Sequence, residues 1–158
     1  MTTSSSTPAV TTSALTGFGN VCINTTAGPN SFTITGTNLT SGNLAIAALS
    51  GYTYATTSNG TYTSSLSIPV TGSSLSQEVF VKFTPSAVQS FNGNIALSGA
   101  GLGAAVNVAV TGVGVNTLAT TTTGAASSIT QTSASLAGSI SATGCGTVSA
   151  YGIEYSTT

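Results

Sequence analysis

The chain has 158 residues, of which one is basic and two are acidic, so charged residues make up 2% of it, against about 25% in an ordinary soluble domain. Lys82 is the only cation, Glu78 and Glu154 are the only anions, and there is no His. Nucleic-acid binding needs Lys and Arg, and zinc or calcium sites need converging Cys, His or carboxylate ligands. The composition excludes these functions, and we expect no cofactor, no metal and no nucleic-acid partner.

Neither a membrane span nor a signal peptide is predicted. Hydrophobic residues make up 40% of the chain, but the longest apolar run, residues 44–49, is far shorter than the roughly 20 residues of a spanning helix. Residues 2–10 contain neither a basic n-region nor an apolar h-region. We therefore expect no direct membrane insertion, and we expect the chain to be a piece of a longer protein.

Short alternating segments recur about every ten residues from residue 15 onward, a rhythm typical of an all-β sandwich or barrel. Residues 1–13, mostly Thr and Ser with one Pro, lack this rhythm and are predicted to form an extended leader or linker. The predicted strands are residues 15–22, 31–37, 44–49, 52–57, 62–70, 78–83, 91–98 and 104–111. Their number and length predict an immunoglobulin-like β-sandwich over residues 14–113.

Alternation within these strands also predicts the core. Val79, Val81 and Phe83 share one face of their strand, because successive strand residues point to opposite sides of a sheet. The same reasoning places in the core Phe32, Ile34, Leu39, Ile46, Leu66, Ile68, Ile95, Leu97, Val106, Val108 and Val110.

A second pattern follows a short hinge at residues 114–117. Strands are predicted at residues 120–123, 133–140 and 148–155. Three strands leave one sheet face uncovered. Residues 118–158 are therefore predicted to be the N-terminal half of a second β-sandwich, completed either by its own missing half or by another chain.

Four motifs in residues 14–115 resemble the Hydin-like, Ig-like repeats of very large secreted proteins of Bacteroidota: FGNVC (18–22), SFTITG (31–36), VFVKFTP (79–85) and FNGNI (91–95). The motifs SITQTSASLAG (128–138) and YGIEYSTT (151–158) resemble the start of a fibronectin type III-like repeat. Such modules are stalk repeats of surface adhesins, including the gliding-motility type exported by the type IX secretion system. The resemblance implies an extracellular, cell-surface location and no catalytic residue.

Cys22 and Cys145 fall in different predicted domains. An interdomain disulfide and a pair of free thiols both remain open, and we favour free, semi-buried thiols that behave as small hydrophobes. A nucleophilic cysteine is disfavoured because the chain has no His to activate it.

Three aromatic residues bracket one predicted turn. Tyr52, Tyr54 and Tyr62 are either an exposed contact for a sugar or protein partner or cross-strand packing pairs. Lys82 and Glu78 share a strand face about 13 Å apart at roughly 3.3 Å per residue, too far to pair. We interpret Lys82 as an exposed edge charge that discourages strand addition.

The sequence thus predicts a non-catalytic structural or adhesive repeat segment of a bacterial cell-surface adhesin or extracellular filament. Its expected partners are neighbouring repeats of the same chain, copies of itself, or a surface polysaccharide or protein. One alternative is a self-assembling fibre subunit that a neighbour completes by strand addition. The other is a carbohydrate-binding module.

Overall fold

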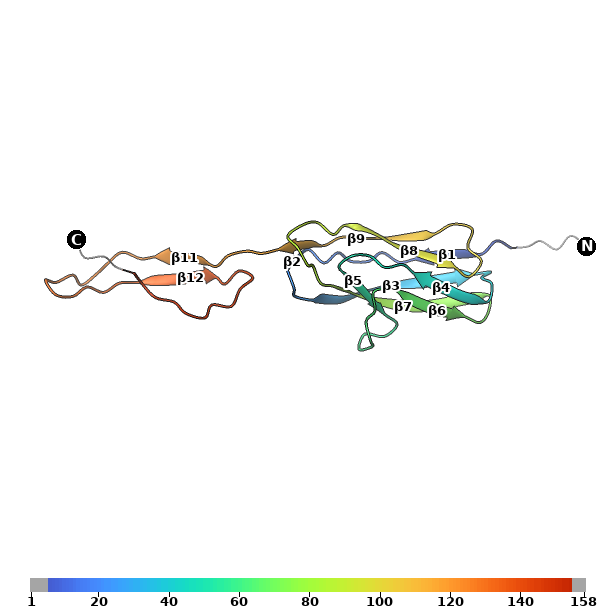
Figure 1. Cartoon of the computed structure of the whole chain (residues 1–158), viewed down its shortest axis with the longest axis horizontal. Coiled ribbons are helices and arrows are strands. Elements are labelled where there is room, and N and C mark those ends of the chain that lie inside the picture. Colours follow the sequence, from blue (N-terminus) through green and yellow to red (C-terminus); the bar gives the residue numbers. More distant parts are fainter. Residues whose placement is uncertain (1–5, 155–158) are drawn as a thin grey trace, which may run out of the picture. The chain divides into compact units, whose positions relative to one another are not determined.

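The structure, a computed structural model, describes residues 6–154, and its regular elements are all β-strands (Figure 1). The chain divides into two compact units, Met1–Gly114 and Val115–Thr158. A search of the described residues found no helix long and apolar enough to cross a membrane.

The first unit is a β-sandwich of two four-stranded antiparallel sheets, which confirms the predicted fold class. The first sheet has the order β1-β3-β7-β5 and consists of β1 (Ala9–Thr12), β3 (Ala27–Thr37), β7 (Ser74–Phe83) and β5 (Tyr52–Ala55). The second sheet has the order β6-β4-β8-β9 and consists of β6 (Leu66–Val70), β4 (Gly42–Ile46), β8 (Gly93–Gly99) and β9 (Val106–Val110).

The segment after β1 passes from one sheet to the other. The backbone N–H of Ser13 donates to Thr33 O (3.0 Å) beside the first sheet, whereas the N–H of Phe18 donates to Thr111 O (2.9 Å) just beyond β9. The segment then forms β2 (Asn20–Cys22), which pairs with β10 (Val113–Val115). The strand predicted over residues 15–22 is therefore regular only at its end, because the residues before it cross between the sheets.

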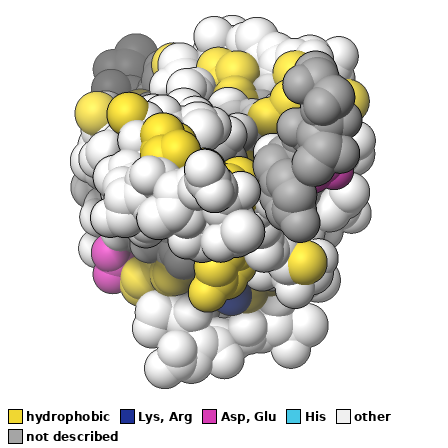
Figure 2. Space-filling view, turned by 90° about the vertical axis from the view of Figure 1, so that its left-hand side faces the viewer, with side chains coloured by type: hydrophobic (Ala, Val, Ile, Leu, Met, Phe, Trp, Pro, Cys, Tyr) yellow, Lys and Arg dark blue, Asp and Glu magenta, His cyan; other side chains and the backbone are white. Residues whose placement is uncertain are grey.

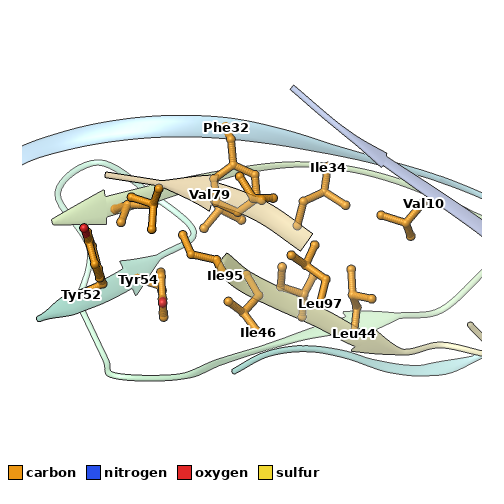
Figure 3. Close-up of a cluster of buried hydrophobic side chains, with 14 of the residues drawn as sticks. Val10, Phe32, Ile34, Leu44, Ile46, Tyr52, Tyr54, Val79, Ile95 and Leu97 are labelled. Atoms are coloured by element: carbon orange, nitrogen blue, oxygen red, sulfur yellow. The ribbon is translucent and has the colours of Figure 1, made fainter. Parts of the chain in front are cut away.

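Alternation along the strands produces the core (Figure 3). Val79, Val81 and Phe83 are fully buried, as predicted, while Glu78 and Lys82 lie on the opposite face of β7. The predicted core residues Leu66 and Val106 pack against this core but stay partly exposed. None of the described polar or charged residues is buried, so burial of apolar surface dominates the stability of this unit.

One predicted boundary is wrong at the N-terminus. Residues 9–12, expected to be part of a leader, form β1 and pair with the end of β3, with Val10 opposite Gly36. Val10 is buried in the core, and the threonines around it suit a strand. Burial of the Val10 side chain and pairing with the long strand β3 together order this segment. Residues 1–5 lie outside the described part of the chain.

The second unit contains one antiparallel pair, β11 (Thr120–Thr123) and β12 (Gly138–Ala142), with a register shift between Thr120 and Thr121. The strand predicted at residues 133–140 is realised only from Gly138. Residues 148–154 carry no strand, and residue 155 lies outside the described range. A third strand needs a packed layer beneath it, and the described part of this unit has no second sheet to supply one.

Candidate functional site

Exposed apolar side chains gather in the second unit. Within residues 6–154, the exposed large hydrophobic residues other than Val88 are Leu118, Ile129, Leu136, Ile140, Val148, Tyr151 and Ile153. Leu118 is 86% exposed and Tyr151 is 89% exposed. No residue between 115 and 154 is buried, so the described part of this unit has no closed core.

All of these side chains except Ile129 line a groove of about 1320 Å³, which we call the apolar groove. Its walls include β11, the start of β12 and residues 146–154, with Leu136, Ile140 and Ile153 among the apolar contributors. Glu154 is the only charged side chain in the lining. A surface of this composition is suited to apolar contact with protein and not to acid–base or metal chemistry.

Among residues 6–154, the hairpin that forms part of the groove wall also has open backbone edges, because β11 and β12 each have a single neighbouring strand there. Hydroxyl groups reinforce the pair: Thr122 Oγ1 and Ser139 Oγ lie 2.7 Å apart, and Ser141 Oγ donates to Thr120 O (3.2 Å). Neither strand carries a charge or a proline. The usual protections against pairing with another strand are therefore missing.

Both cysteines are disulfide-bonded. Of the two states left open by the sequence, the free thiols that we favoured are contradicted. Cys22 ends β2, and Cys145 follows β12 in a turn where its N–H donates to Thr117 O (2.8 Å). The separation of the two cysteines in the sequence did not indicate a disulfide. A cysteine in a disulfide has no free thiol, so it acts neither as a nucleophile nor as a metal ligand.

Two of the three candidate tyrosines belong to the core, so they are not an exposed contact. Tyr52 is 2% exposed and Tyr54 is 0% exposed, both on the inner face of β5. The Tyr52 hydroxyl donates to Phe91 O (3.1 Å). Burial raises the pKa of each phenol to about 12, with the neighbouring Tyr52 adding to the effect at Tyr54. Their two-residue spacing on one strand was the signal for packing.

Tyr62 lies on the surface, in the loop that projects from the sandwich between β5 and β6 (Figure 1). A bridge between Tyr54 and Thr63 fixes the loop beside β5, and the Tyr62 hydroxyl donates to Ser58 O (2.9 Å). The Lys82 Nζ atom lies 4.2 Å from the centroid of the Tyr62 ring. Partial burial raises the pKa of Tyr62.

Lys82 does not guard an edge, contrary to the prediction. It lies on β7, which β3 and β5 flank on both sides. Phe80, which the sequence reasoning missed, is half-buried on the same outer face, between Lys82 and Glu78. The sequence could have predicted this position, because Phe80 is two residues from each charged residue and successive strand residues alternate between faces.

Comparison with known proteins identifies no family: no family model matches the chain, and no curated protein matches its sequence. Within residues 6–154, no group of three or more His, Cys, Asp or Glu side chains is placed to hold a metal ion.

Proposed function

We propose that the chain is a non-catalytic structural and adhesive segment of a bacterial cell-surface adhesin or extracellular filament. The apolar groove of the second unit carries this proposal. A large apolar side chain is stabilised by about 1.5 to 3 kcal/mol when it is buried, and this unit leaves several exposed. Its working state is therefore one in which further protein covers the groove.

An extracellular location is supported by the disulfide-bonded cysteines, because disulfides persist in oxidising compartments. The surface chemistry also fits a densely packed array: in Figure 2 a few charged side chains are scattered among uncharged white and yellow ones. The resemblance to stalk repeats of Bacteroidota adhesins points to the same setting, including export by the type IX system.

The chemistry of the side chains supports a non-catalytic role. A serine or threonine nucleophile needs a general base, and the chain offers no His and a single Lys. That lysine lies over an aromatic ring. The groove itself contributes one carboxylate, Glu154, and its lining has no second carboxylate, His or Lys with which to share acid–base work.

A specific observation favours a second candidate, the self-assembling subunit. In the described part of the chain, both edges of the β11–β12 hairpin are open and uncharged, so a strand from another copy can extend the sheet. In this second candidate function, a copy of the same chain covers the groove. In the first candidate function, neighbouring modules cover the groove.

A triple variant, Leu136→Ser, Ile140→Ser and Ile153→Ser, tests the proposal in the full chain. Val88→Ser is the matched control, because Val88 is 64% exposed but belongs to the first unit. We expect the parent and the control either to self-associate in sedimentation equilibrium or to bind a fluorescent apolar dye, and the triple variant to do neither. A parent chain that neither associates nor binds dye would overturn the proposal.

A further inference from the structure

The outer face of the first sheet carries a cluster that the apolar groove does not involve. We call it the Lys82 patch and define it by Lys82, Phe80 and Glu78 of β7, Ser31 of β3, and Tyr62 of the loop after β5. Cross-strand register holds it together, since Ser31 and Ala55 flank Phe80 and Thr53 lies opposite Lys82.

Lys82 is the only Lys or Arg of the chain. Among the described residues, its contact is with a ring and not with a carboxylate. The ammonium lies over Tyr62, whose hydroxyl is bonded to Ser58 O. Glu78 is engaged elsewhere, because Ser31 Oγ donates to its carboxylate at 2.7 Å. The patch therefore presents a positioned cation that forms no ion pair with Glu78, so an incoming anionic group is complementary to the Lys82 end of the patch.

The side chains around Lys82 indicate which class of anionic ligand the patch suits. Phe80 is half-buried yet is not among the hydrophobic residues packed against the core, so its ring contributes to the outer surface. Hydroxyl residues of the flanking strands lie beside it, with Ser31 of β3 opposite Phe80 and Thr53 of β5 opposite Lys82. A sugar ring matches this combination, since its apolar C–H face can lie on an aromatic ring while its hydroxyls bond to Ser and Thr.

We propose that the Lys82 patch binds a uronic-acid polysaccharide, with a sugar carboxylate accepting from the Lys82 ammonium and the sugar ring lying against Phe80 and Tyr62. This deepens the adhesive role proposed above by naming a ligand class, but it depends on residues of the other unit, so either proposal can fail alone. A bilayer or nucleic acid fits less well, because each requires several cations.

Binding of full-length protein to polygalacturonate and to its fully methyl-esterified, neutral form tests the proposal. We expect the parent to bind the acidic polymer at least about tenfold more tightly than the ester, a difference of about 1.4 kcal/mol. Lys82→Met should remove that preference, and Lys82→Arg should keep it. One ion pair predicts a loss of at most about fourfold between 50 and 200 mM salt.

The controls separate loss of the site from loss of the fold. Val88→Ser changes an exposed residue outside both the Lys82 patch and the apolar groove, and it should leave polymer binding unchanged. The comparison of the two polymers needs no variant, so it stands even if Lys82→Met unfolds. Equal binding of both polymers, no binding of either, or a Lys82→Met variant that binds like the parent would each overturn the proposal. The proposal would also be overturned if Lys82→Met changed self-association of the protein and left polymer binding unchanged.

Discussion

Tyr52 and Phe83 stack on each other inside the first unit, with ring centroids 4.9 Å apart and planes inclined by 25°. Phe83 also contacts Phe18 at 5.6 Å and, edge to face, Phe91 at 5.5 Å. These four residues come from four different segments of the chain. Phe83 therefore joins the first sheet, the segment that crosses between the sheets and the residues just before β8 in one aromatic cluster.

Removal of the Phe83 ring should be costly. Phe83→Ala is expected to lower the free energy of unfolding by about 3 to 5 kcal/mol, because it empties a fully buried site. Phe80→Ala, on the same strand but facing outward, should cost less than half as much. Urea denaturation measures both. Equal losses in the two variants would mean that the inward and outward positions of β7 are assigned the wrong way round.

The two core tyrosines should respond differently to loss of their hydroxyls. Tyr52→Phe removes a hydrogen bond to Phe91 O and should cost about 0.5 to 1.5 kcal/mol. The Tyr54 hydroxyl is buried and has no hydrogen-bond partner among the described residues, so Tyr54→Phe should leave stability unchanged or increase it. Thermal denaturation of the pair checks this. A larger loss for Tyr54→Phe than for Tyr52→Phe would contradict the assignment.

The raised pKa values of Tyr52 and Tyr54 predict that the protein becomes less stable at alkaline pH. Their pKa of about 12 in the fold lies above the value of about 10 in an unfolded chain. The unfolded state therefore loses these protons first, and stability should fall as pH rises from about 10 to about 12.

Denaturation midpoints across pH 5 to 12 measure the effect. The curve should be nearly flat below pH 9, because the chain contains no His. The double variant Tyr52→Phe, Tyr54→Phe should lose much of the alkaline slope. A double variant with the parent's slope would show that other groups control it.

Gly99 occupies a position that a side chain cannot share. Its φ is +98°, and an added Cβ would collide with the carbonyl oxygen of Asn43 on β4. Gly99→Ala should destabilise the protein by about 1 to 3 kcal/mol through backbone strain. Gly103→Ala is the matched control, because no atom lies within 4 Å of its added Cβ. Similar denaturation midpoints for the two variants would exclude the predicted strain.

The sequence was a good guide wherever burial and strand parity coincide. The alternation of Val79, Val81 and Phe83 places each of them correctly, because the core selects one face of β7. It was a poor guide to β1, since a single buried side chain, Val10, marks that strand. It could not predict that the segment before β2 changes sheets, because backbone hydrogen bonds to Thr33 and Thr111, and not side-chain pattern, define that crossing.

The functional features were less predictable for physical reasons. Tyr52 and Tyr62 are the same residue type near one turn, yet one fills the core and the other meets Lys82 at the surface. Strand neighbours decide this difference, and they are set by long-range pairing. In the second unit, the alternation at residues 148–154 suggests a strand, but side-chain pattern alone does not order a segment without a packed partner layer.

Hydrogen exchange of the β11 and β12 backbone amides tests most directly whether the second unit is an open surface awaiting a protein partner. In a dilute, monomeric sample, these amides should exchange orders of magnitude faster than those of β7, because exposed hydrogen bonds open readily. If copies of the chain supply the cover, exchange should slow with increasing concentration and change little with salt, as three charged residues predict. Protection of β11 and β12 equal to that of β7 in the dilute monomer would contradict the account.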